Sequence, residues 1–166
     1  MRPLKMKDIV LHPIGIINTP YKTQENIPIQ GRFDDSVEGC CVLYDKYSEG
    51  LLHLDEFSYA ILIYHFNKSE KEEIKSRPFL EPVEHGIFAI RSPHRPNKIG
   101  FSVVKINKIT GNKLFFSQVD IFDGTPLLDI KPFIKHFDNR DNVKSGWLDK
   151  HFKNGNIPDE TILNKR

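Results

Sequence analysis

The chain has 166 residues, of which 39% are hydrophobic and 28% are charged. These values are typical of one globular domain with a single core, so they exclude wholesale disorder and disfavour two domains. With 24 Lys and Arg against 22 Asp and Glu, the formal charge is +2. A polybasic nucleic-acid binder is therefore excluded, and any contact with nucleic acid has to come from a local patch of cations.

The two cysteines, Cys40 and Cys41, are neighbours in the sequence. Adjacent cysteines rarely reach the geometry of a disulfide or a zinc site, so we interpret both as ordinary thiols in a strand. No apolar run approaches the roughly 18 residues that span a bilayer, and residues 1–10 carry charges where a signal peptide needs an apolar stretch. We therefore expect a cytoplasmic protein that does not contact a membrane.

The composition of the whole chain predicts strands rather than helices, because 19 Ile and 12 Phe stand against only two Ala. A strand is expected over residues 10–17, then a long loop over 22–38 and a short strand over 40–44. Residues 57–66, FSYAILIYHF, are almost continuously apolar and predict a strand buried on both faces. Residues 69–76 offer at best a solvated helical turn.

Three further strands are expected in the second half, over residues 85–90, 99–109 and 113–122. The apolar parity changes within residues 99–109, which predicts a bulge near Val103. Gly111 and Asn112 form a two-residue hairpin signal that joins the last two strands.

The end of the chain gives weaker signals. Residues 125–137 are rich in Pro and apolar side chains and receive no predicted element, and a weak helical patch lies at 147–152. About six or seven strands without strand–helix alternation predict an all-β fold, a compact single-domain barrel or sandwich.

Several common kinds of functional motif have no counterpart in the sequence. It contains neither G-x-G nor G-x-x-x-x-G-K-[ST], which disfavours a Rossmann or P-loop nucleotide site. The seven histidines lack metal-ligand spacing, and there is no G-x-S-x-G motif. We therefore expect no metal centre and no serine nucleophile.

The segment GIFAIRSPHRPNKIG, residues 86–100, concentrates Arg91, His94, Arg95 and Lys98 around two prolines, with no carboxylate among them. A loop stiffened by prolines loses little entropy when it orders, so its cations present fixed donors to a phosphate, a carboxylate or a purine edge. Two interpretations stay open: a ligand-binding loop, or a stiff surface turn with solvated cations.

The segment VDIFDGTPLLDIKPF, residues 119–133, places Asp120, Asp123 and Asp129 around a Gly-Thr-Pro turn. Carboxylates at the end of a strand suit a cationic ligand or ribose hydroxyls, and Asp120 also suits a general base. A plain turn is the alternative. Nothing in the spacing fixes the octahedral ligand set of a Mg²⁺ site.

Four segments in this order resemble the TsaA-like family, the tRNA N6-threonylcarbamoyladenosine methyltransferases. They are IGIINTPYK (14–22), EFSYAILIYHF (56–66), GIFAIRSPHRPNKIGFSVV (86–104) and DIFDGTPLLDIKPF (120–133). The resemblance places the family domain at residues 9–137 and leaves residues 138–166 as a short polar, partly helical extension. Longer family members carry a further C-terminal domain, which we do not expect within these 166 residues.

The resemblance implies a β-barrel that binds S-adenosyl-L-methionine without a Rossmann domain and acts as a homodimer, with the cofactor near the subunit interface. The cofactor-binding residues that it implies are Pro28, Ile29, Gln30, Gly31, Asn67, Lys68, Arg91, Phe101, Asp120, Ile121, Phe122 and Asp123.

The implied partner is tRNA, and the implied reaction is N6-methylation of threonylcarbamoyladenosine in the anticodon loop. Arg95, Lys98, Arg77 and Lys131 are the expected substrate-binding cations, and Tyr21 or Phe33 is expected to stack on an unpaired base. Asp120 and His65 are the options for a general base, although strand parity directs His65 toward the core. The competing readings are a non-catalytic S-adenosylmethionine- or RNA-binding module and a small barrel that binds RNA without a cofactor.

Overall fold

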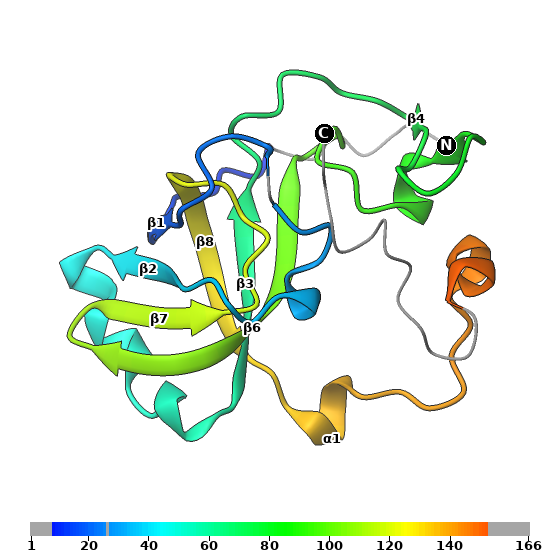
Figure 1. Ribbon diagram of the computed structural model, residues 1–166. Coiled ribbons are helices and arrows are strands. Elements are labelled where there is room, and N and C mark those ends of the chain that lie inside the picture. The colour runs from blue at the N-terminus through cyan, green and yellow to red at the C-terminus, as the bar shows by residue number, and fades with distance from the viewer. Residues whose placement is uncertain (1–7, 26, 153–166) are drawn as a thin grey trace, which may run out of the picture.

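Six antiparallel strands close into a barrel in the computed structural model, which describes residues 8–25 and 27–152 (Figure 1). Around the barrel they follow the order β1-β2-β7-β6-β3-β8, and β8 pairs back onto β1. The all-β class is thus confirmed. The six strands are β1 (Gly15–Asn18), β2 (Gly39–Leu43), β3 (Tyr59–His65), β6 (Ile99–Thr110), β7 (Lys113–Ser117) and β8 (Thr125–Pro132).

The interior of the barrel is filled by side chains from all six strands. In a barrel of this size the lumen has room for side chains but none for a ligand, so a binding site has to lie at a rim or outside. On β3 alternate side chains point outward and are only half-buried, so the predicted burial of both faces is wrong. Fully buried at the centre are Ile17, Cys41, Leu62, Val104, Leu114, Phe116 and Leu127.

The hairpin of β6 and β7 is confirmed at the predicted turn. Thr110 pairs with Lys113, and Gly111 between them adopts a φ of +59°, a left-handed conformation that suits glycine. β7 ends at Ser117, because Gln118 also turns left-handed with a φ of +62°. The predicted strand over 113–122 is therefore too long by five residues.

The bulge in β6 lies further along the strand than its predicted position near Val103. Gly100, Ser102 and Val104 form one continuous inward-facing series, so the strand is regular at Val103. The register against β7 shifts between Ile106 and Lys108 instead. The apolar side chains at 99, 101 and 103 point outward, which explains why hydrophobicity alone misplaced the parity.

The N-terminal strand is shorter than predicted and the strand that closes the barrel was missed. β1 begins at Gly15, not at residue 10, while β2 agrees with its prediction. β8 contains two prolines, which argue against a strand, but Pro126 and Pro132 lie at its two ends, where few ladder hydrogen bonds are lost.

A small two-stranded sheet lies outside the barrel, formed by β4 (Lys75–Ser76) and β5 (His85–Gly86). The strand predicted over 85–90 is wrong beyond Gly86, because the chain turns into the 3-10 helix η4 (Ile87–Ala89). The helical turn predicted over 69–76 is absent from the structure of that segment.

The remaining helices are short. None of those in the described part of the chain is long and apolar enough to cross a membrane. The weak patch predicted at 147–152 is confirmed as a 3-10 helix. These elements are η1 (Gly31–Phe33), η2 (Asp45–Leu51), η3 (Leu54–Glu56), α1 (Lys135–Asp138) and η5 (Gly146–His151).

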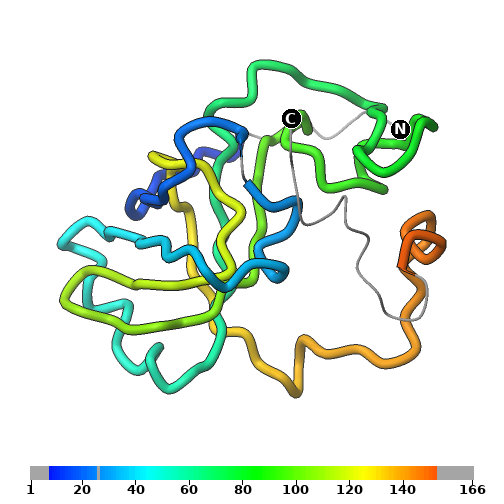
Figure 2. Tube along the Cα trace, viewed as in Figure 1, coloured from blue at the N-terminus to red at the C-terminus, as the bar shows by residue number. Residues whose placement is uncertain are grey.

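η5, orange in Figure 1 and Figure 2, stands away from the barrel, on the same side as β4, which is labelled in Figure 1. Trp147 donates its indole N–H to the carbonyl oxygen of Ala89 at 2.9 Å and stacks on His85, with ring centroids 5.1 Å apart. The buried carboxylate of Glu81 pairs with Lys150 and His151 of η5 and, at 2.7 Å, with His85. The segment after the barrel is thus held onto residues 81–89.

Candidate functional site

Asp120 lies just after β7, and its carboxylate links two segments that are far apart in the sequence, β6 and η1. The hydroxyl of Ser102, on β6, donates to its Oδ1 at 2.6 Å, and the backbone N–H of Gly31, on η1, donates to its Oδ2 at 3.1 Å. Since both carboxylate oxygens accept a hydrogen bond, the loop over 28–31 is fixed against the rim of the barrel.

Close backbone contact explains why residue 31 is a glycine. A Cβ at Gly31 would lie 1.8 Å from the carbonyl oxygen of Gln118. The left-handed Gln118 lets the chain leave β7 and pass directly over η1. A larger residue at position 31 would push this loop away from Asp120.

A buried tyrosine extends the hydrogen bonds of Asp120 into the barrel. The hydroxyl of Tyr64 lies 3.0 Å from that of Ser102, so Tyr64, Ser102 and Asp120 form a chain of hydrogen bonds from the core to the rim. The Tyr64 ring covers Gly100, where an added Cβ would lie 2.1 Å from the ring. Because glycine at position 100 has no Cβ, the Tyr64 ring can pack against it.

Burial raises the pKa of Asp120 above its ordinary value. The hydrogen bonds from Ser102 and Gly31, and the positive charge of Arg91, act in the opposite direction and limit the rise. The carboxyl group at the centre of this cluster thus holds a proton more readily than an exposed aspartate does.

Arg91 supplies a positive charge that acts on Asp120. Its guanidinium is exposed, donates to Oε1 of Gln30 at 3.0 Å and lies 5.8 Å from the centroid of the Phe101 ring. A second cation–aromatic pair follows the end of β3, where the ammonium of Lys68 lies 4.9 Å from the centroid of Phe122. Both pairs present a positive charge beside an aromatic face.

The structure thus brings together seven of the twelve residues expected to bind the cofactor, in three contacting groups. These are Gly31 with Asp120, Gln30 with Arg91 and Phe101, and Lys68 with Phe122. Asn67 is exposed at the turn after β3, and Ile29 is half-buried beside Gln30.

The other three of the twelve expected cofactor-binding residues take part in the structure of the protein itself. Pro28 is buried, and Ile121 is 2% exposed within the core. Asp123 accepts hydrogen bonds from the backbone N–H of Thr19 at 3.1 Å and from the Asn18 side chain at 3.4 Å, and the hydrogen bond from Thr19 contributes most to lowering its pKa. Asp123 therefore anchors the end of β1.

Two of the four expected substrate cations, Lys98 and Arg95, donate hydrogen bonds to backbone carbonyl oxygens of the protein itself. The ammonium of Lys98 donates to the carbonyl oxygen of Ser69 at 2.6 Å, and the guanidinium of Arg95 donates to that of Ile90 at 3.2 Å. The hydroxyl of Ser69 in turn lies 2.8 Å from Nδ1 of His94. These contacts hold the loop over 91–98 against the end of β3.

The other two cations lie on separate parts of the molecule. Arg77 is exposed beside β4, whereas Lys131 lies on β8 (Figure 1) and pairs with Asp129 at 2.6 Å. The structure therefore does not gather the four cations into one patch, and their role in binding a substrate stays a prediction.

Two side chains differ from their expected positions. His65 belongs to the outward-facing series of β3 and is half-buried, so its predicted core position is wrong. Tyr21 is only 7% exposed, so its ring face is covered and unavailable for the expected stacking on an unpaired base. Phe33 is half-buried on η1.

Sequence reasoning missed Ser102 and Tyr64. A polar residue in the middle of an apolar strand is the signal that could have found Ser102, because a serine at an inward-facing position needs a partner. That signal was hidden by the wrong parity assigned to residues 99–103.

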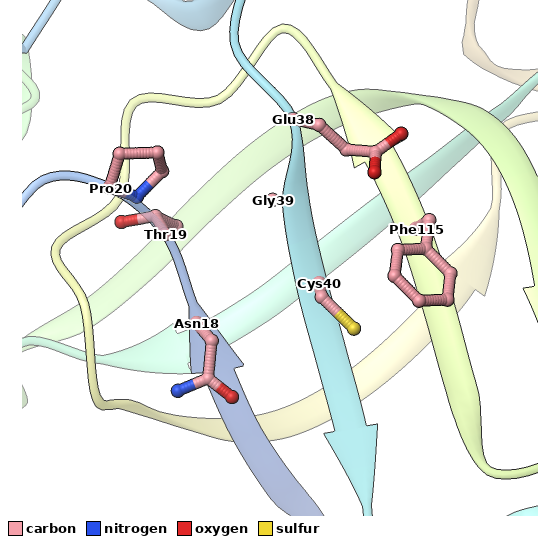
Figure 3. A pocket seen from close by; sticks show the side chains of 7 residues that line it. All are labelled: Asn18, Thr19, Pro20, Glu38, Gly39, Cys40 and Phe115. Atoms are coloured by element: carbon pink, nitrogen blue, oxygen red, sulfur yellow. The ribbon is translucent and has the colours of Figure 1, made fainter.

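A shallow hollow lies on the outside of the barrel between β1, β2 and β7, with Cys40 beside Phe115 (Figure 3). Burial raises the pKa of the Cys40 thiol, which keeps the thiol protonated and unreactive. None of the residues that line the hollow carries a positive charge. They are Asn18, Thr19, Pro20, Glu38, Gly39, Cys40 and Phe115. The chemically richer surface is that around Asp120 and Arg91. The described residues hold no cluster of metal-ligating side chains.

Residues 16–139 match the family described as the tRNA-methyltransferase O N-terminal domain. The chain belongs to this family. The resemblance inferred from the four segments is therefore confirmed, and the barrel is the fold of this family: it matches the crystal structure of TrmO from Pseudomonas aeruginosa with a TM-score of 0.73 and 29% identity.

Two relatives of this family member illustrate its range. A probable S-adenosyl-L-methionine-binding protein of Pyrococcus abyssi is 46% identical over 143 residues, covering 86% of this chain and 78% of that protein. The human tRNA (adenine(37)-N6)-methyltransferase is 28% identical over 166 residues, covering 96% of this chain and 38% of the human protein. The match to TrmO covers 85% of this chain and 63% of the crystallised one.

Proposed function

We propose that this protein binds S-adenosyl-L-methionine at the cluster around Asp120 and Arg91 and transfers a methyl group to N6 of a modified adenine in tRNA. The observation that carries the proposal is the meeting of a carboxylate, an exposed guanidinium and the Phe101 ring, from separate segments, at the rim of a barrel of this family. Relatives named for S-adenosylmethionine binding and for adenine methylation support it.

The residues present fit the charges of this cofactor. The carboxylate of S-adenosylmethionine is complementary in charge to the exposed Arg91 guanidinium. Its ammonium and sulfonium charges are complementary to the carboxylate of Asp120. The Phe101 and Phe122 rings offer faces for the adenine or the sulfonium. A cofactor bound at the rim also agrees with a barrel whose interior is filled.

The reaction needs positioning and the removal of one proton. When bound, S-adenosylmethionine supplies a methyl group on a positively charged sulfur, and the sulfur leaves as a neutral thioether when the carbon–nitrogen bond forms. The protein has to align the accepting nitrogen and take its proton. Asp120 is the proposed proton acceptor, because its pKa is raised while its position is fixed by Ser102 and Gly31.

We propose threonylcarbamoyladenosine in the tRNA anticodon loop as the acceptor and a homodimer as the working form. The human relative is named for methylation of adenine 37 in tRNA, which supports the acceptor base. The loop over 91–98 begins at Arg91, within the cluster, and we expect its other cations, Arg95 and Lys98, to meet the phosphates of an RNA bound there.

A non-catalytic S-adenosylmethionine-binding module is the second candidate. The observation in its favour is that several relatives, such as those of Pyrococcus abyssi and Archaeoglobus fulgidus, are named for binding of this compound alone. Binding without turnover on tRNA would favour this candidate.

The decisive test is calorimetric titration of the cofactor-free protein with S-adenosylmethionine, repeated with Arg91→Ala. We expect saturable binding by the wild type and at least about tenfold weaker binding by the variant, because a charge-assisted hydrogen bond is lost. Lys46→Ala, on η2, removes a cation elsewhere and should bind normally.

Methyl transfer is then measured on tRNA that carries threonylcarbamoyladenosine and on tRNA that lacks it. Methylation of the modified tRNA alone supports the proposed acceptor. Failure of the wild type to bind S-adenosylmethionine would remove the basis of both candidates.

A further inference from the structure

The hydroxyl of Tyr21 is buried and has no hydrogen-bond partner among the residues that the structure describes. Tyr64, also buried, bonds to Ser102 instead. A buried hydroxyl without a partner is expensive, and native proteins almost always supply one. In a family of ligand-binding domains, such an orphan next to the candidate site points to a partner that arrives with the ligand.

Hydrogen bonds of the backbone place Tyr21 beside the Asp120 segment. Its carbonyl oxygen accepts from the backbone N–H of Asp123 at 2.8 Å, and its own N–H donates to Oγ1 of Thr19 at 3.2 Å. The Thr19 hydroxyl in turn donates to the carbonyl oxygen of Ile121 at 2.8 Å. Tyr21 is therefore fixed against residues 121–123, next to Asp120.

The surroundings of the Tyr21 hydroxyl are rich in negative charge. Burial, then Asp34 and Asp120, raise the pKa of its phenol. Asp34 belongs to the same turn as Gly31, since its N–H donates to the Gly31 carbonyl oxygen at 3.0 Å, and Gly31 holds Asp120. A hydroxyl near two carboxylates suits a ligand group that is cationic and donates hydrogen bonds.

Arg91 supplies the opposite charge near Asp120. Arg91 acts on the Asp120 carboxyl through its charge and is exposed beside Gln30. A ligand that satisfies both sides carries an ammonium and a carboxylate close together, as an α-amino acid does. The sulfonium of S-adenosylmethionine carries no N–H and cannot donate to a phenol.

We propose that the Tyr21 hydroxyl accepts a hydrogen bond from the α-ammonium group of bound S-adenosylmethionine, with Asp34 and Asp120 beside it and Arg91 on the carboxylate. This proposal rests on the proposed function and assigns the amino-acid end of the cofactor to a defined corner of the site. Tyr21 is then a specificity-determining residue that distinguishes the complete cofactor from its nucleoside fragment.

The test compares two ligands on Tyr21→Phe and on the wild type by calorimetry. The ligands are S-adenosylmethionine and 5′-methylthioadenosine, which keeps the nucleoside and the sulfur but lacks the amino acid. For Tyr21→Phe we expect about tenfold weaker binding of S-adenosylmethionine, the loss of one hydrogen bond to a charged group. Binding of methylthioadenosine, measured directly or by competition, should stay within about twofold of the wild type.

Two control variants separate a ligand contact from a structural role. Tyr44→Phe removes an exposed hydroxyl on a tyrosine outside the cluster and should change neither affinity. The ligand-free melting temperature of Tyr21→Phe should stay the same or rise, because an unpaired buried hydroxyl is removed. Tyr64→Phe should lower it, because Ser102 loses a partner.

Each remaining outcome contradicts the proposal in a distinct way. If Tyr21→Phe weakens the binding of both ligands equally, Tyr21 either contacts the nucleoside end of the cofactor or only maintains the shape of the site. Unchanged affinity for S-adenosylmethionine would mean that water satisfies the hydroxyl. If the wild type itself fails to bind S-adenosylmethionine, the proposed function fails, and the inference about Tyr21 fails with it.

Discussion

Ser102 connects the core of the barrel to the candidate site through a single hydroxyl. It donates to the half-buried Asp120 and lies within hydrogen-bond distance of the buried Tyr64, so both groups depend on it. When one member of such a chain is removed, the others are left without partners, and the cost exceeds that of the lost contact itself. Ser102 is thus a positioning residue for Asp120.

Ser102→Ala is expected to lower the free energy of unfolding by about 1–3 kcal/mol, because the buried Tyr64 and the half-buried Asp120 each lose a partner. Urea denaturation followed by circular dichroism measures the change. Ser58→Ala, at an exposed position before β3, serves as the control and should be neutral. A neutral Ser102→Ala would mean that the three side chains are not coupled.

The same variant should show a particular dependence on pH. The Asp120 pKa is raised above its unfolded value, so the native state binds this proton more tightly and stability falls as pH rises through the folded pKa. The Ser102 hydrogen bond opposes that rise. The destabilisation by Ser102→Ala should therefore be larger at neutral pH than in acid.

Individual residues were predictable where their chemistry was conspicuous. Arg91 and Asp120 stand out because a cation in a proline-bounded loop and a carboxylate at a strand end are unusual enough to notice. Tyr21 was placed on the surface and is buried, since the sequence does not say that the turn after β1 folds back onto residues 121–123.

At the scale of elements, η5 is attached to residues 81–89 through the Glu81 carboxylate and through Trp147. A carboxylate that is 3% exposed meets Lys150, His151 and His85, and these hydrogen bonds, that of Lys150 first, lower the Glu81 pKa to about 2. Since the unfolded value is 4.5, this group stabilises the docked arrangement above that pH and loses its contribution as pH falls toward about 2.

Acidification is therefore expected to release η5 from residues 81–89. Trp147 is the single tryptophan of the chain, so its fluorescence reports the release as a shift to longer wavelength. Glu81→Gln should show the shifted spectrum already at neutral pH and lose most of the acid transition. Glu56→Gln, in an exposed pair with His53, should behave like the wild type. A Glu81→Gln spectrum identical to the wild type would contradict the role of this carboxylate.

Elements were predictable where local signals agree with tertiary structure. The β6–β7 hairpin follows from Gly111 and Asn112, and β2 and β3 from their apolar runs. β8 was missed because its prolines oppose strand formation locally, while pairing with both β1 and β3 outweighs them.

At the scale of the whole molecule, the fold depends on β8 to join the two ends of the sheet. Leu127 is fully buried and pairs with Gly15 of β1 and with Tyr64 of β3. Leu127→Ala is expected to cost about 2–5 kcal/mol of unfolding free energy, measured by urea denaturation. Leu52→Ala, at a leucine that is 75% exposed, should cost less than about 0.5 kcal/mol. If Leu127→Ala lowers the free energy of unfolding as little as Leu52→Ala does, closure of the barrel contributes little to stability.

The all-β class was predictable from composition and turn signals, because it needs only the sum of many weak preferences. The closed order of the strands was not, since it depends on pairing between residues more than 100 positions apart, such as Gly15 with Leu127. The resemblance to the family supplied the barrel that the local patterns left open between barrel and sandwich.

Closure of the barrel also limits how another molecule can attach to it. Every barrel strand pairs with a neighbour on both sides over at least part of its length, so the barrel has no edge strand that a foreign strand could extend along its whole length. A second copy of the chain or an RNA must be recognised by side chains of the loops and the outer face. Recognition by this scaffold can therefore change through substitutions in those segments while the sheet itself stays protected from templated aggregation.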